Sequence, residues 1–129
     1  MARVLALTRD LLFGSQVQGA LAAAGHDVEL TGASASVGER LGDGAEGSPP
    51  RADVLVVDLV DGELDGAGAV EALAAAGALR ETRTLAFYSH VDDAARERAR
   101  LAGFDLVVPR SRMAREGSRL VAQLLAERR

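Results

Sequence analysis

The chain has 129 residues, a net charge of −4, no cysteine and no lysine, so that all 15 basic residues are arginine. This composition excludes disulfides, cysteine-based metal sites and lysine-dependent chemistry such as a Schiff base, and the negative charge disfavours nucleic acid as a partner. No apolar run reaches the roughly 20 residues of a membrane helix or serves as a signal peptide, so we expect one cytoplasmic domain over residues 1–129 that binds no membrane.

In the first third of the chain, strand-like and helix-like segments alternate. The run Arg3–Leu7 predicts a strand. The next segment, Leu12–Ala24, predicts a helix because apolar residues recur at every third or fourth position, and Gly25 follows it where helix C-termini favour glycine. A second strand is predicted for Asp27–Thr31 and a short helix for Ser34–Leu41.

The middle third starts with the glycine- and proline-rich stretch 42–51, which predicts a loop of unassigned role. The run Asp53–Asp58 is apolar from its second residue to its fifth, as is typical of a strand buried on both faces in a parallel sheet. A helix with an apolar stripe starting at Val70 follows. We expect it to end near Gly77, because glycine destabilises a helix interior.

The last third contains two strand-like runs and two helices. Thr84–Ser89 and Asp105–Pro109 predict the fourth and fifth strands. Between them, Asp92–Ala102 predicts a helix with alanines inward and arginines outward that stops at Gly103. Ser111 is the expected N-terminal cap of the final helix. The apolar stripe of that helix consists of Leu120, Val121, Leu124 and Leu125.

Five strands that alternate with helices predict an α/β fold. The expected architecture is a doubly wound, five-stranded parallel sheet in a flavodoxin-like three-layer sandwich, with strand order 2-1-3-4-5. In such folds, functional residues lie at the carboxyl ends of the strands, near the switch point between strands 1 and 3. We expect the residues at those ends to form one polar patch centred on Asp58. They are Thr8, Arg9, Asp10, Asp58, Ser89, His90, Arg110 and Ser111.

The stretch DLVDGELDG, residues 58–66, resembles the receiver domain of bacterial two-component response regulators, and the resemblance extends over nearly the whole chain. Asp58 stands at the position of the family's phosphoacceptor aspartate, at the end of strand 3. Asp65, followed by glycine, stands where the next turn of the family ends in Asp-Gly. Ser89 matches the hydroxyl residue at the end of strand 4, and Arg110 matches the basic residue after strand 5.

The chain also departs from the family pattern. Thr8 and Arg9 stand where the family has the acidic pair that helps to bind Mg²⁺, and Asp10 follows one residue too late. These departures imply an atypical, degenerate receiver with no certain cofactor, in which Mg²⁺ is disfavoured. An ion bound nevertheless would take Asp10, Asp58 and the backbone carbonyl of Val60 as ligands.

A guanidinium at the position of a metal-binding acid repels a divalent cation. Arg9 could instead bind Asp58 directly, in a two-pronged hydrogen-bonded contact that imitates the neutralisation supplied elsewhere by metal and lysine. We therefore predict a receiver that is fixed in one state and signals by binding partners.

The resemblance implies a role in two-component phosphorelay signal transduction through protein–protein contacts, and not an enzyme. The implied partner is a histidine kinase or an effector, and a homodimer is a further prediction. Because the chain ends soon after the fifth helix, we expect a stand-alone domain without an output domain. The expected partner surface lies on the last two helices, although a solvated face is the simpler interpretation. Its residues are Arg96, Arg100, Arg112 and Arg115.

Two other classes of function compete with a signalling module. A small-ligand or nucleotide-binding module of flavodoxin-like fold would use the same switch point, but TRDLLFGSQ after the first strand has a single glycine and aromatic residues are sparse. An enzyme on this fold would need a Ser-His-Asp arrangement or paired carboxylates, and the sequence does not supply a clear set of either.

Overall fold

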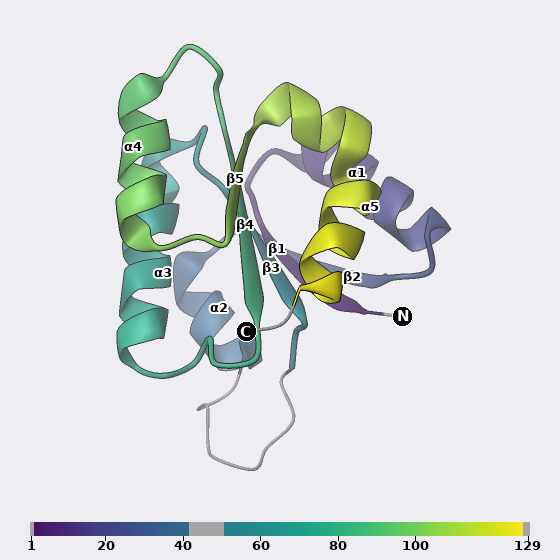
Figure 1. Ribbon diagram of the computed structural model, residues 1–129, viewed down its shortest axis with the longest axis horizontal. Coiled ribbons are helices and arrows are strands. Elements are labelled where there is room, and N and C mark those ends of the chain that lie inside the picture. The colour runs from purple at the N-terminus through teal and green to yellow at the C-terminus, as the bar shows by residue number, and fades with distance from the viewer. Residues whose placement is uncertain (1, 42–50, 128–129) are drawn as a thin grey trace.

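The computed structural model describes residues 2–41 and 51–127 and has five parallel strands between two layers of helices (Figure 1). The order in the sheet is β2-β1-β3-β4-β5, so the predicted α/β class and strand order are confirmed. The predicted loop 42–51 lies outside the described residues, apart from Arg51. The strands are β1 (Arg3–Leu7), β2 (Asp27–Thr31), β3 (Val54–Asp58), β4 (Arg83–Tyr88) and β5 (Leu106–Pro109).

The helices cover both faces of the sheet. In Figure 1, α1 and α5 lie on one face, and α2, α3 and α4 lie on the other. A short 3₁₀ turn, η1 (Gly62–Leu64), connects β3 to α3. No helix within the described residues is long and apolar enough to cross a bilayer. The helices are α1 (Leu11–Ala23), α2 (Ser34–Leu41), α3 (Gly66–Ala75), α4 (Asp93–Ala102) and α5 (Arg110–Ala126).

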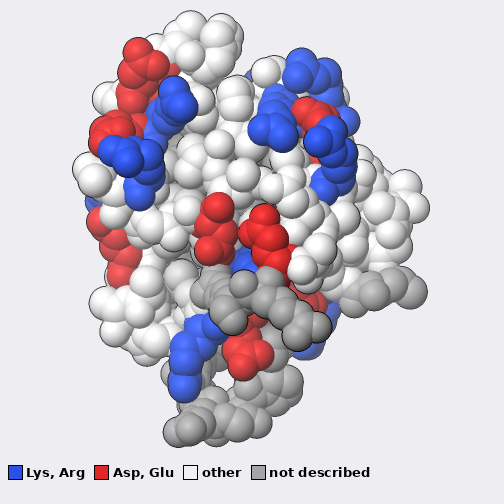
Figure 2. Space-filling model, in the orientation of Figure 1, with Lys and Arg blue, Asp and Glu red and all other residues white. Residues whose placement is uncertain are grey.

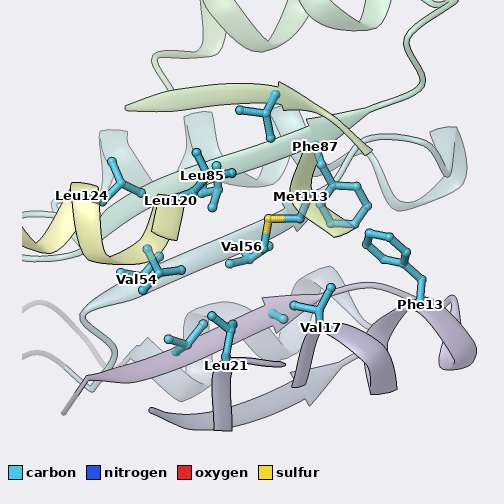
Figure 3. Packing of buried hydrophobic residues seen from close by; sticks show 14 residues of the cluster. Phe13, Val17, Leu21, Val54, Val56, Leu85, Phe87, Met113, Leu120 and Leu124 are labelled. Carbon is cyan, nitrogen blue, oxygen red and sulfur yellow. The ribbon is translucent and has the colours of Figure 1, made fainter. Parts of the chain in front are cut away.

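Strand β3 forms the centre of the hydrophobic core. Every residue of Val54–Asp58 is buried, and successive side chains point to opposite faces of the sheet. Val54 and Val56 belong to the apolar cluster below α1 and α5 (Figure 3), whereas Leu55 and Val57 belong to the cluster below α2 and α3. The continuous apolar run in the sequence therefore reflects two separate layers of packing.

Glycines end three of the helices, as the sequence predicts. Gly25, Gly77 and Gly103 have φ values of 94°, 76° and 89° and follow α1, α3 and α4. This left-handed conformation is favourable for glycine because it has no Cβ, and it lets the chain leave the helix towards the next strand.

Two predictions for α5 are wrong. Ser111 is not its N-cap, because α5 begins at Arg110, directly after Pro109, and no side chain caps it. Proline, with its fixed φ, starts the helix two residues earlier than an N-cap at Ser111 implies. Leu125 is 39% exposed, because it lies about 100° around the helix from the buried Leu124 and so leaves the contact with the sheet.

An ion pair between Glu71 of α3 and Arg98 of α4 should make stability depend on acid pH. The hydrogen bond from Arg98 lowers the pKa of the Glu71 carboxyl below its ordinary value of 4.5. The stabilisation that this ion pair gives the folded state is therefore present above pH 4.5. It is lost as the pH falls through the lower pKa that Glu71 has in the folded state.

We expect Glu71→Gln to be slightly less stable than the native chain at neutral pH, with the difference vanishing as the pH falls below about 4.5. Urea unfolding at a series of pH values measures this, and Glu39→Gln on α2 serves as the control. A constant difference between Glu71→Gln and the native chain at all pH values would contradict the assignment.

Candidate functional site

Asp58, the last residue of β3, is a buried carboxylate with a hydrogen-bond partner on each oxygen. It is 3% exposed. The hydroxyl of Thr8 donates to its Oδ2 over 2.8 Å, and the backbone N–H of Val60 donates to its Oδ1 over 2.8 Å. The Thr8 oxygen also accepts a hydrogen bond from the backbone N–H of Asp10, at 3.1 Å. The loops after β1 and β3 are thus joined through one threonine hydroxyl.

Arg9 does not bind Asp58, so the predicted two-pronged contact between them is wrong. Its Nε and Nη2 donate instead to the two carboxylate oxygens of Asp61, at 2.7 and 2.9 Å, and Nη2 also donates to Glu63 at 3.1 Å. These hydrogen bonds, with Asp61 the larger cause, raise the pKa of the Arg9 guanidinium above its ordinary value.

The exposure of the side chains explains why Arg9 binds Asp61 and Glu63 and not Asp58. The Arg9 side chain is 45% exposed, and its acidic partners lie in the surface turn η1 and its N-cap. Pairing there keeps three charges partly hydrated, whereas placing a guanidinium beside the buried Asp58 would remove two charges from water at a large desolvation cost. The short neutral Thr8 takes that place instead.

Arg110 is held by Asp10 and by an aromatic ring. Its Nη2 lies 2.8 Å from Asp10 Oδ2, and its guanidinium carbon lies 4.3 Å from the centre of the Phe13 ring. The other oxygen of Asp10 accepts a hydrogen bond from the Phe13 N–H at 3.0 Å and caps α1. One carboxylate therefore ties the start of α1 to the start of α5.

The remaining predicted site residues line an open groove of about 440 Å³ at the same edge of the sheet. Ser89, His90, Arg110 and Ser111 lie along it, and Phe13 and Val60 supply apolar wall. The expected single patch is thus divided into a buried part, in which Thr8 contacts Asp58, and this groove.

Three residues at the site were not predicted from the sequence: Phe13 under Arg110, and the acids Asp61 and Glu63 that bind Arg9. The two acids are two residues apart in a glycine-bearing turn directly after β3. That spacing is the sequence feature that could have indicated an acidic binding site for Arg9.

The residues around Asp58 do not fit a Mg²⁺ ion in this arrangement. Mg²⁺ requires an octahedral set of oxygen ligands, usually with one or two carboxylates, whereas the two groups that contact Asp58 are hydrogen-bond donors, the Thr8 hydroxyl and the Val60 N–H. Asp10 uses its oxygens for the helix cap and for Arg110. Across residues 2–41 and 51–127, no three His, Cys, Asp or Glu side chains gather in a group that could hold a metal ion.

The four arginines predicted as a partner surface lie on α4 and α5. Figure 2 shows basic and acidic side chains gathered over these two helices, with an uncharged surface between them. Arg100 pairs with Glu97 on α4, and Arg112 pairs with Glu116 on α5, whereas Arg96 and Arg115 are exposed. Two of the four guanidiniums therefore already have an acidic partner on their own helix.

No protein-family model matches the sequence, and no curated protein is detectably similar to it. Solved structures are similar in fold. A putative response regulator from Chloroflexus aurantiacus superposes with a TM-score of 0.81 at 17% identity, covering 98% of both chains. The non-phosphorylated HemR receiver domain from Leptospira biflexa gives 0.77 at 18% identity, covering 100% of this chain and 98% of that one.

The BeF₃-activated DrrB receiver domain gives a TM-score of 0.76 at 15% identity, covering 98% of this chain and 99% of the other. At these low identities the likeness concerns the fold. The chain has the fold of response regulator receiver domains, as its resemblance to them implied.

Proposed function

We propose that this chain is a signalling module that works through protein–protein contacts and keeps one conformation without Mg²⁺-dependent phosphorylation. The fold, shared with receiver domains of two-component systems, supports the signalling class. Asp58 remains the candidate phosphoacceptor by position. A histidine kinase or an effector is the partner that such a domain would take in the cytoplasm, and the proposed role does not involve catalysis.

The observation that carries the proposal is the set of contacts made by Asp58. The Thr8 hydroxyl and the Val60 N–H neutralise part of its charge, in the place where a receiver would need a metal ion. Phosphoryl transfer to a carboxylate depends on positioning and on neutralising cations. The two side chains that could supply such a positive charge are paired with other acids: Arg9 binds Asp61, and Arg110 binds Asp10.

An NMR titration tests the proposal. We expect the amide signals of Asp58, Ser89 and Arg110 to stay unchanged when millimolar Mg²⁺ and then beryllofluoride, a phosphoryl mimic, are added to the native chain. Saturable shifts centred on these residues would contradict the fixed state and identify a working phosphoacceptor.

Arg9→Asp should create divalent-cation binding. The change removes both ion pairs of Arg9 and leaves three carboxylates in adjacent loops, an arrangement that a hydrated Mg²⁺ can bridge. The melting temperature of the variant should then rise with Mg²⁺, by an amount equivalent to about 1.4 kcal/mol at a tenfold excess over Kd. Thermal unfolding with and without MgCl₂ measures this.

Arg100→Asp provides the matched control, because it makes the same change of charge on the surface of α4, beside Glu97. Its melting temperature should not respond to Mg²⁺. If both variants respond equally, or if neither does, the role assigned to Arg9 in excluding cations is wrong.

A further inference from the structure

The strand β2 lies at one edge of the sheet (Figure 1) and carries charged side chains on the face that α2 covers. Val28 and Leu30 pack against the apolar cluster below α1 and α5. Asp27 and Glu29 alternate with them along the strand and therefore point to the opposite face. In the parallel register Arg3 of β1 lies beside Asp27, which places Arg3 on that face too. This charged set lies near the starts of β1 and β2, and not at the carboxyl ends of the strands.

The helix α2 covers only part of this face. It has eight residues, a length of about 12 Å, and buries only Val37 and Leu41. Beside it lies an open pocket of about 560 Å³, a size typical of small-molecule sites. Leu5 and Ala52, each 3% exposed, line the pocket and belong to the core cluster below α2 and α3, so they form its apolar floor.

The pocket is basic, although the chain as a whole is acidic. Three arginines and two acids line it, a formal charge of +1 in a chain whose net charge is −4. The arginines come from three separate segments: Arg3 from β1, Arg40 from α2, and Arg51 from the stretch before β3. Guanidiniums that converge on one hollow favour phosphate groups, because their planar N–H pairs match the oxygens of a phosphate.

The guanidiniums keep hydrogen-bond donors for a ligand. Arg40 binds Glu29, but a guanidinium has more N–H donors than one contact with a carboxylate oxygen uses. The Arg51 side chain is exposed, and it has no hydrogen-bond or ion-pair partner among residues 2–41 and 51–127. A phosphate could therefore bind without breaking the contact between Arg40 and Glu29.

The outer side of β2 argues against a further strand as the occupant. Asp27 donates its N–H to β1 and the Thr31 carbonyl accepts from β1, so the backbone groups of Val28 face away from the sheet. The side-chain amide of Gln18 donates to the Val28 carbonyl at 3.1 Å. Because this amide already takes an outward-facing carbonyl, a small molecule is a more favourable occupant than a strand paired along β2.

We propose that this pocket binds a small phosphate monoester through its three arginines, at a site separate from Asp58. The pocket shares no lining residue with the groove beside Asp58. A phosphate monoester carries about two negative charges at neutral pH and has three acceptor oxygens, so it can bind several guanidiniums together. A monocarboxylate has one charge, and the pocket already contains two carboxylates that compete for the same arginines. The organic part of the ester would lie on the apolar floor.

An NMR titration of the full chain tests the phosphate and the organic part separately. The probes are AMP, phenyl phosphate and phosphoserine. Each is compared with its parent compound without phosphate, with inorganic phosphate, and with succinate, a dianion without phosphorus. We expect at least one ester to give saturable shifts of the Leu5, Glu29 and Ala52 amides, with an affinity at least about tenfold above those of the comparison compounds. The amides of Ser89 and Arg110 should not shift.

Matched variants locate the contact. Arg3→Gln/Arg51→Gln should weaken binding of that ester by at least about tenfold, because two guanidiniums leave the pocket. Arg96→Gln/Arg115→Gln, which removes two exposed arginines of α4 and α5, should leave the affinity unchanged. Asp27→Asn should strengthen binding, because it removes a carboxylate that lines the pocket of the anion. A gain in affinity cannot come from a loss of folding.

Several outcomes would overturn the inference: no saturable shift with any of the three esters, equal binding of succinate or inorganic phosphate, or equal weakening by both double variants. Shifts centred on Ser89 and Arg110 would also overturn it, because they would place the ester in the groove beside Asp58. Circular dichroism checks that the variants are folded. If Arg3→Gln/Arg51→Gln does not fold, Asp27→Asn decides, and an affinity no higher than that of the native chain would reject the site.

Discussion

Replacing Thr8 by valine should lower the free energy of unfolding by about 2–3 kcal/mol, because it leaves one oxygen of a buried carboxylate without its donor. Valine has nearly the shape of threonine, so packing at this position, which is 8% exposed, is kept. Only the hydroxyl is lost, and with it the bond to Asp58 and the acceptor for the Asp10 N–H. Urea unfolding of the native and variant chains measures the difference.

Thr8→Ser is the matched control. It keeps the hydroxyl and removes one methyl group, which should cost about 0.8 kcal/mol for the lost apolar burial. If Thr8→Val unfolds at the same urea concentration as the native chain, the hydrogen bond to Asp58 contributes nothing to stability. The account of Asp58 as a carboxylate stabilised by its neighbours would then be wrong.

Gly66→Ala should destabilise the domain by about 1–3 kcal/mol through overpacking directly behind Asp58. A Cβ at Gly66 would lie 2.4 Å from Cγ1 of Val57 and 3.1 Å from a methyl of Leu59. Val57 is fully buried in the close-packed central strand, so its side chain, β3 or the start of α3 must shift. Chemical unfolding measures the loss.

Gly62→Ala, four residues earlier in the same connection, is the control. A Cβ at Gly62 meets nothing within 4 Å, so this variant should match the native chain or exceed it slightly, because alanine restricts the unfolded chain. An equal loss in both variants would show that the connection needs glycine for its backbone and not for the space beside Val57.

The fold could be derived from local patterns. The apolar run of β3 specified a central strand buried on both faces, and its alternating side chains now contact two different helix layers. Glycines at helix ends set the lengths of α1, α3 and α4. Such signals are readable because each depends on residues only a few positions apart and on the steric limits of the backbone.

The partners of the charged residues could not be derived in the same way. The sequence placed Arg9 and Arg110 near Asp58, but Arg9 binds Asp61 and Glu63, and Arg110 binds Asp10. These contacts join residues 52 to 100 positions apart. Which acid each arginine binds depends on the direction in which its side chain leaves the helix or loop. Knowing only that a residue follows the end of a strand does not specify that direction.

The sequence by itself determined the order of the strands, the edge at which the polar residues meet, and Asp58 as the acid at the end of the central strand. Only the tertiary structure decided that a threonine hydroxyl, and not a guanidinium, lies beside that acid. The physical reason is desolvation. Arg9 keeps its charge near water by binding acids at the surface, and the buried carboxylate is left to a small neutral donor that fits the space.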